Sequence, residues 1–245
     1  MSQSTSSFSE WPAERLIFPV SRIEVRVSDE PHPFCLSRQT EIAANWDREV
    51  SANPALFDGR MLLMRAIELR HGVVSGECHV VPFSAFLLWR KTRPAGAAVH
   101  LFGLAVIVSS DGAVIAIRMG QHTANPGRVY CAAGSLDPDD IREGYCDIDG
   151  NMAREVLEET GLSLSDAKTV SGFYGLHGQD VVTLFRVYHF AETASELIEG
   201  IAAHIAADPE PEIDTALAIH TADAAQHPYP PFMPPVLEWV FKSMQ

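Results

Sequence analysis

The chain has 245 residues, of which 47% are hydrophobic and 20% are charged, and its formal net charge is −14 at pH 7. Such a composition is typical of a globular protein with a full core, in one large domain or two small ones. The acidic excess, with no basic run, excludes a nucleic-acid backbone as the main partner, because phosphate binding needs clustered Lys and Arg. The longest apolar stretch, residues 101–119, is interrupted by Ser109-Ser110-Asp111-Gly112, so we expect no membrane span.

The cysteines and the start of the chain indicate where the protein resides. Cys35, Cys78, Cys131 and Cys146 form no CxxC pair. Free thiols in a reducing cytosol are therefore favoured over a disulfide or a zinc site. A signal peptide has a charged start followed by an apolar run, and the first residues do not show this pattern. We therefore expect a cytoplasmic protein. The serine-rich residues 1–12 are expected to be disordered.

Hydrophobic periodicity divides the first part of the chain into strands and helices. In chain order, it predicts a strand over 18–27, a helix over 40–50, two strands over 61–69 and 73–81 and a helix over 82–90. The run of residues 91–96, which contains Pro and Gly, marks a boundary. We therefore assign residues 13–95 to an α/β unit and residues 96–245 to a second domain.

The second part begins with an apolar hairpin about an Asp-Gly turn. In chain order, the pattern predicts strands over 101–108, 113–118 and 128–133, a helix that ends at 161, strands over 168–176 and 181–190, a helix over 193–207, a strand over 216–221 and a helix over 236–244. Asp147 or Asp149 can cap the first of these helices, and Gly161 can end it in the left-handed conformation.

Three glutamates before this glycine are the most specific feature of the sequence. Glu155, Glu158 and Glu159 follow one another at spacings i, i+3 and i+4, which places them on one helix face within an arc of about 100°. Like charges at these spacings destabilise a helix by roughly 0.2–0.5 kcal/mol per pair, so a cation between them explains the pattern. Clustered carboxylates favour Mg²⁺, or Mn²⁺, over zinc. A solvated acidic helix face is the alternative that these three residues alone leave open.

The full string over 154–162 decides between these interpretations. It reads Arg-Glu-Val-Leu-Glu-Glu-Thr-Gly-Leu and resembles the second half of the Nudix box, Arg-Glu-aliphatic-x-Glu-Glu-x-Gly-aliphatic, at every specified position. The order of elements over residues 100–225 also resembles the Nudix fold. The resemblance implies an α/β fold, with a Nudix-type mixed β-sheet sandwiched between helices and with residues 13–95 as an N-terminal α/β extension.

The first half of the box departs from the family pattern. With the family's spacing, the first glutamate and the glycine would fall on Cys146 and Asp140. A match begins instead at Gly134, six residues further from the helix than in the family, so we predict an insertion over 136–149. The spacing does not decide which acidic residue of the insertion replaces the first glutamate. Glu143 is the only glutamate among them.

The resemblance implies a Mg²⁺-dependent hydrolase that cleaves the diphosphate of a nucleoside diphosphate linked to another moiety, with nucleotide sugars and ADP-ribose as the leading substrates. Residues 53–59 look similar to the UDP-glucose pyrophosphatase-like branch. Such an extension sometimes binds substrate or forms a dimer in the family, so a homodimer is among the expected partners. Two alternatives stay open. One is a catalytically weak Nudix domain that senses a ligand or binds a partner, and the other is a hydrolase of coenzyme A, dinucleoside polyphosphates or oxidised nucleotides.

The resemblance also assigns roles to the residues of the box. Glu155, Glu158 and Glu159 would hold the cation, with a backbone carbonyl near Gly134 as a neighbouring ligand. Arg154 would hold a glutamate in place through a charge-assisted hydrogen bond.

Residues outside the box complete the predicted site. The family commonly adds an acidic residue from a later loop, and Glu210 and Glu212 are the best placed, with Glu212 assigned to catalysis. Arg118, Gln121 and Arg128, at the end of the hairpin and in the strand that follows, are the candidates for contacts with the substrate phosphates.

Overall fold

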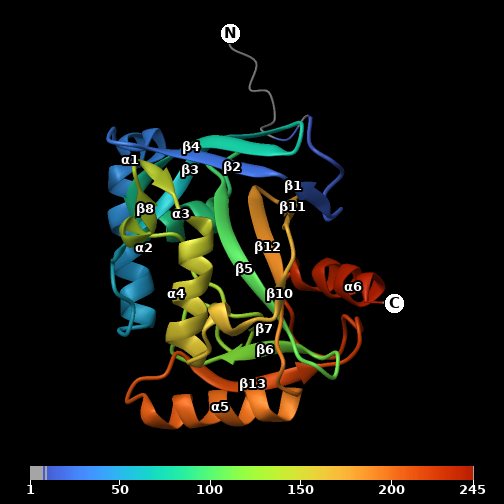
Figure 1. The fold of residues 1–245 in the computed structure, drawn as a ribbon. Coiled ribbons are helices and arrows are strands. Elements are labelled where there is room, and N and C mark those ends of the chain that lie inside the picture. The colour runs from blue at the N-terminus through green and yellow to red at the C-terminus, as the bar shows by residue number, and fades with distance from the viewer. Residues whose placement is uncertain (1–7, 9, 245) are drawn as a thin grey trace.

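The structure, a computed structural model, describes residue 8 and residues 10–244, and a large mixed β-sheet lies at its centre (Figure 1). Its strands are β1 (Phe18–Val20), β5 (His100–Val108), β6 (Val114–Met119), β7 (Val129–Tyr130), β10 (Thr169–Val170), β11 (Phe173–Gly178), β12 (Val181–His189) and β13 (Ile213–Ile219). The strand order is β1-β11-β12-β5-β6-β13, with β10 paired to β12 and β7 paired to β6. Strands β5 and β12 run parallel. All but the first residue of β5 are buried, as is typical of a parallel strand covered on both faces.

The smaller sheet combines strands from two distant parts of the chain. Its members, in spatial order, are β3 (Arg60–Arg70), β4 (Val73–Pro82), β2 (Arg22–Ser28), β9 (Tyr145–Cys146) and β8 (Ile141–Arg142). Strands β3 and β4 form a hairpin whose turn residues, His71 and Gly72, both have positive φ angles, as a tight hairpin turn requires. Because β8 and β9 belong to the predicted insertion, the insertion extends the N-terminal sheet.

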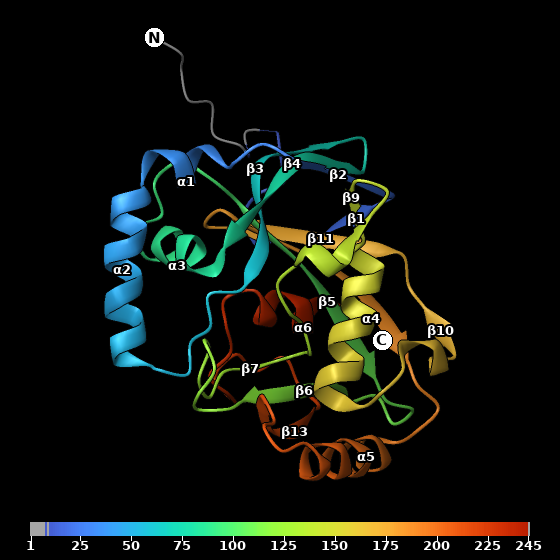
Figure 2. The ribbon, with the colours of Figure 1, turned by 90° about the vertical axis from the view of Figure 1, so that its left-hand side faces the viewer.

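Six α-helices cover the sheets in the described part of the chain. They are α1 (Pro33–Ser37), α2 (Gln39–Ala52), α3 (Phe83–Thr92), α4 (Ile148–Thr160), α5 (Ala194–Ala207) and α6 (Met233–Ser243). Helices α4 and α6 lie on opposite sides of the large sheet, and α5 packs along β13 (Figure 1). Figure 2 shows α2 and α3 side by side next to the smaller sheet. The predicted fold class, α/β with a mixed sheet between helices, is confirmed.

Three predicted strands were wrong in detail. The strand predicted over 168–176 is divided into β10 and β11. The strand predicted over 18–27 is divided into β1 and β2, which belong to different sheets, because the chain turns at Ser21, whose backbone N–H donates to the Gly72 carbonyl at 2.8 Å. The strand predicted over 128–133 is limited to the two residues of β7. Helix α1 was not predicted, since five residues are too few to establish a helical period.

The division at residue 95 stays a prediction, and strand pairing crosses it in both directions. Strand β1 belongs to the large sheet, whereas β8 and β9 belong to the smaller one. The expected disorder of residues 1–12 falls mostly outside the described residues, and within them Trp11 is buried. The four cysteines are free, as expected. Among residues 10–244, no helix has the length and apolar character needed to cross a bilayer.

Candidate active site

Helix α4 begins and ends at the residues that the sequence indicated. The side chain of Asp147 accepts a hydrogen bond from the Gly150 backbone N–H at 2.9 Å, which satisfies one of the free donors of the first turn. Gly161 ends the helix with φ 72°, a conformation that favours glycine. The buried residues Met152 and Val156 face the core. The helix is therefore fixed at both ends and along one side.

The three glutamates of α4 do not all point to the same place. Glu155 and Glu159 are largely buried and line a cavity, whereas the side chain of Glu158 is 59% exposed. Glu159 accepts a hydrogen bond from the Ala133 backbone N–H at 3.2 Å. The structure thus places two of the predicted carboxylates in this cavity and the third outside it, although all three border a smaller cavity.

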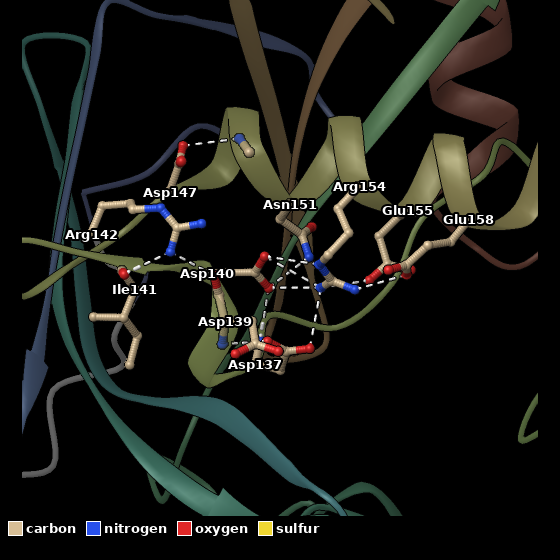
Figure 3. A network of polar contacts seen from close by, with 11 residues as sticks. Asp137, Asp139, Asp140, Ile141, Arg142, Asp147, Asn151, Arg154, Glu155 and Glu158 are labelled. Carbon is tan, nitrogen blue, oxygen red and sulfur yellow. Dashed lines mark hydrogen bonds and ion pairs between the residues drawn. The ribbon is translucent and has the colours of Figure 1, made fainter. Parts of the chain in front are cut away.

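Arg154 lies at the centre of an acidic network (Figure 3). Its guanidinium forms ion pairs with Asp137 at 3.2 Å, Asp140 at 3.0 Å, Glu155 at 2.9 Å and Glu158 at 3.0 Å. Arg154 therefore forms ion pairs with two of the box glutamates and also anchors the preceding loop to the helix.

Asp140 is the residue of the insertion that meets Arg154 from the loop. Its side chain is 3% exposed, and it also accepts hydrogen bonds from the Asn151 side chain and the Asp137 backbone, both at 2.9 Å. Asp140 lies six positions after Gly134, which is the family's spacing between the glycine and the first glutamate. The extra residues therefore follow Asp140. The sequence identifies Asp140 at this position only when residues are counted forward from Gly134, and not when they are counted back from Arg154.

Burial raises the pKa values of the two inward-facing glutamates. The pKa of Glu155 rises to about 7, because the carboxylate is desolvated and lies near other acidic groups, while Arg154 opposes the rise. The pKa of Glu159 is raised well above its ordinary value, mainly because the carboxylate is desolvated and also because the charges of Glu155 and Glu212 lie nearby. Two buried carboxylates side by side are unfavourable unless a cation neutralises them.

Gly134 allows Glu155 to lie against the loop. A Cβ atom at this position would be 2.1 Å from the Glu155 carboxyl carbon, so no other residue fits without displacing the glutamate. The loop that the resemblance assigned to cation binding is thus in contact with one of the box carboxylates.

The cavity has a volume of about 580 Å³, with Glu155, Glu159 and Glu212 at its acidic end. A smaller cavity of about 190 Å³ also borders these three residues and adds Glu158 and Glu210. Of the predicted phosphate contacts, Arg128 lines the large cavity.

Arg118 and Gln121 do not line the large cavity, so it gives no reason to assign them to the substrate. The cavity wall contains further residues that the sequence did not single out. They come from α3, from β5 and from the segment before α6, and include Phe83, Phe86, Arg90, Arg93, His100, Phe102 and Phe232.

The acidic end has the donors that a hard divalent cation prefers. Within residues 10–244, no three His, Cys, Asp or Glu side chains already surround a common metal position, and Arg154 binds two of the box glutamates. Glu155 and Glu159 nevertheless present buried carboxylate oxygens to the cavity, and Glu212 borders it. Carboxylate oxygens are the ligands that Mg²⁺ and Mn²⁺ take in proteins.

No family model matches the chain, and no curated protein sequence matches it. Several solved structures match the chain. The MutT protein from Methanosarcina mazei Go1 shares 16% identity over 60% of this chain and 96% of its own, with a TM-score of 0.41. The NUDIX domain of Shewanella oneidensis NrtR, complexed with ADP ribose, shares 13% identity over 65% of this chain and 98% of its own, with a TM-score of 0.42. A bifunctional NMN adenylyltransferase/ADP ribose pyrophosphatase from Francisella tularensis shares 13% identity over 65% of this chain and 45% of its own, with a TM-score of 0.40.

Of these three, the NrtR domain is named as a NUDIX domain. At these identities and TM-scores the matches concern the fold, so the activity has to be argued from the residues of the site.

Proposed function

We propose that the protein is a Nudix-type hydrolase that uses a divalent cation, Mg²⁺ or Mn²⁺, to cleave the diphosphate of a nucleoside diphosphate linked to another moiety. The observation that supports this proposal is the pair of buried carboxylates, Glu155 and Glu159, at one end of a cavity of about 580 Å³. Nucleotide sugars and ADP-ribose are the leading substrate class.

The site residues divide the work of hydrolysis. A cation at this position supplies charge neutralisation at the phosphoryl oxygens and a more nucleophilic water. Glu155 and Glu159 hold the cation, Arg154 orients Glu155 and Glu158, and Glu212 accepts the proton of the attacking water. One water is consumed, one P–O bond of the anhydride breaks, and two phosphomonoesters leave.

The test is hydrolysis of a substrate panel with Mg²⁺ by the wild type and by Glu159→Gln. The panel contains ADP-ribose, UDP-glucose, GDP-mannose, NADH, coenzyme A, diadenosine tetraphosphate and an oxidised nucleoside triphosphate. We expect the wild type to hydrolyse at least one member and Glu159→Gln to lose more than the roughly 10–100-fold that outer-shell residues of metal sites cost. Glu199→Gln, an exposed residue of α5, is the matched control and should keep full activity. Equal turnover by both variants would contradict the proposal.

One observation favours a second candidate, a ligand-sensing Nudix domain with weak catalysis. Arg154 already neutralises Glu155 and Glu158, so the site is partly satisfied without a cation. This candidate predicts that ADP-ribose or a nucleotide sugar raises the melting temperature while no member of the panel is hydrolysed.

A further inference from the structure

Helix α3 presents one of its faces to the cavity. Four residues that line the cavity follow one another at spacings of three and four along α3 and its C-cap, which places them on one side of the helix. They are Phe83, Phe86, Arg90 and Arg93. Ala85 and Leu88 lie on the opposite side and are buried. The helix is therefore anchored by its apolar side, and two phenylalanines followed by two arginines form a stripe along the cavity.

The two arginines of this stripe have no acidic partner at ion-pair distance. Among the described residues, neither Arg90 nor Arg93 forms a salt bridge, although Glu49 and Asp180 lie near enough to favour their charges. The Arg90 side chain donates a hydrogen bond to the Asn125 side chain at 3.5 Å and lies over the Phe86 ring. Burial lowers the pKa of both arginines. A desolvated guanidinium without a carboxylate is unfavourable, so the cavity favours an anionic occupant.

Arg93 is held in place by its surroundings. Its guanidinium stacks over the Trp89 ring, 4.2 Å from the centroid, and donates to the Gln179 carbonyl at 2.8 Å. Its backbone adopts the left-handed conformation, with φ 41°, and its N–H donates to the Trp89 carbonyl at 2.8 Å, which ends α3. The side chain is thus pre-organised at the edge of the cavity.

A row of aromatic rings leads from α3 toward the carboxylates. Phe86 lies 4.8 Å from His100, His100 lies 5.3 Å from Phe102, and Phe102 lies 5.1 Å from Phe232, measured between ring centroids. Burial, with the charges of the two arginines, lowers the pKa of His100 to about 3, so its ring is neutral at physiological pH.

The end of this row is close to the acidic site. Phe102 pairs with Ser135, the neighbour of Gly134, against which Glu155 packs. Rings in a row are suited to stack a planar base, and guanidinium groups to bind phosphoryl oxygens.

We propose that the α3 stripe is the nucleotide-binding wall of the cavity: Arg90 and Arg93 bind a phosphoryl group of a nucleotide, and the aromatic row that begins at Phe86 stacks its base. The N-terminal region thereby supplies the wall that recognises the nucleotide, and α4 supplies the acidic end. This inference rests on the proposed function, because it takes the occupant to be the hydrolase's nucleotide substrate.

The test measures nucleotide binding without hydrolysis. ADP and UDP are titrated calorimetrically into the full chain in the presence of EDTA, for the wild type, Arg90→Met and Arg93→Met. Charge-assisted hydrogen bonds of this kind predict that each variant weakens binding by about tenfold or more. Arg90→Lys, which keeps the charge, should recover part of the loss. Arg48→Met, which removes an exposed charge from α2, is the matched control and should bind as the wild type does.

Kinetics with the substrate identified in the panel separates this inference from the proposed function. We expect Arg90→Met to raise KM by about tenfold or more with little change in kcat, and Glu159→Gln to lower kcat while still binding ADP or UDP. If both arginine variants keep the wild-type affinity and KM while Glu159→Gln is inactive, the inference is overturned and the proposed function stands. Arginine-dependent nucleotide binding by a wild type that hydrolyses nothing would overturn the proposed function alone. Absence of ADP and UDP binding by the wild type would overturn the inference. If Arg93→Met fails to fold, Arg90→Met decides, since Arg90 lies within α3 and its side chain makes a single hydrogen bond among the described residues, to Asn125.

Discussion

Replacing Glu155 by glutamine should stabilise the cation-free protein at alkaline pH. In the unfolded chain this carboxyl ionises near its ordinary pKa of 4.5, whereas in the fold burial raises its pKa to about 7. Between these two values, the unfolded chain has released a proton that the folded protein still retains, so stability falls as the pH rises. Above about pH 7 the full effect is present, about 3 kcal/mol for this one carboxylate.

The expected size of the effect follows from this difference. Glutamine resembles the protonated carboxyl in shape and carries no charge, so Glu155→Gln at pH 8 should regain up to about 3 kcal/mol. In a chain of this length, that corresponds to roughly 6–12 °C in Tm. At pH 5, where the folded wild type retains the proton, the two proteins should differ by less than about 1 kcal/mol.

The assay is thermal unfolding in EDTA from pH 5 to pH 8, repeated with Mg²⁺. With Mg²⁺ at about 1,000 times Kd the order should reverse, because binding then adds about 4.1 kcal/mol to the folded wild type, more than the substitution regains. Glu199→Gln, which removes an exposed carboxylate of α5, should shift stability by no more than about 0.5 kcal/mol at either pH. A Glu155→Gln protein that is less stable than the wild type at pH 8 without a cation would refute the reasoning. A wild type whose stability does not fall between pH 5 and pH 8 would refute it as well.

Two further substitutions test the loop before α4. Gly134→Ala should abolish the stabilisation by Mg²⁺, because its Cβ would lie 2.1 Å from the Glu155 carboxyl carbon and displace that side chain. Gly200→Ala, where nothing lies within 4 Å, should keep the stabilisation, and equal stabilisation of the two variants by Mg²⁺ would contradict the steric argument. Asp140→Asn should cost about 1–3 kcal/mol and lower kcat roughly 10–100-fold by weakening the hold on Arg154, with Asp140→Glu milder in both assays. Unchanged denaturation and turnover in Asp140→Asn would show that the buried contact is dispensable.

The acidic helix could be predicted from the sequence because its determinants are local. The cap at Asp147, the glutamate spacing and the terminal glycine at 161 all lie within fifteen residues of one another, and the structure places each in α4 as expected. Asp140 was harder to predict. Its partner Arg154 lies on the other side of an insertion whose position in the sequence was undetermined. The family's spacing therefore identifies Asp140 only when residues are counted forward from Gly134.

The other end of the cavity could not be predicted in the same way. The stripe that contains Phe86 and Arg90 has the pattern of an ordinary amphipathic helix, and which surface that helix meets depends on long-range packing. Arg118 was selected from its place at the end of a hairpin strand. That strand pairs with β13, where the register shifts between Ile213 and Thr215, and no local pattern indicates which way its side chains then face.

The N-terminal region supports the site from two sides. The β8–β9 hairpin, which follows Asp140, is attached to β2, and the Val27 backbone N–H donates to the Gly144 carbonyl at 2.8 Å. The Leu62 backbone N–H of β3 donates to the Leu136 carbonyl of the same loop, also at 2.8 Å. The loop that carries Asp140 is therefore fixed by the N-terminal sheet, which β4 joins directly to α3. Because one structural unit positions both the carboxylate loop and the arginine stripe, the distance between the two ends of the cavity is set by that sheet rather than by the box itself.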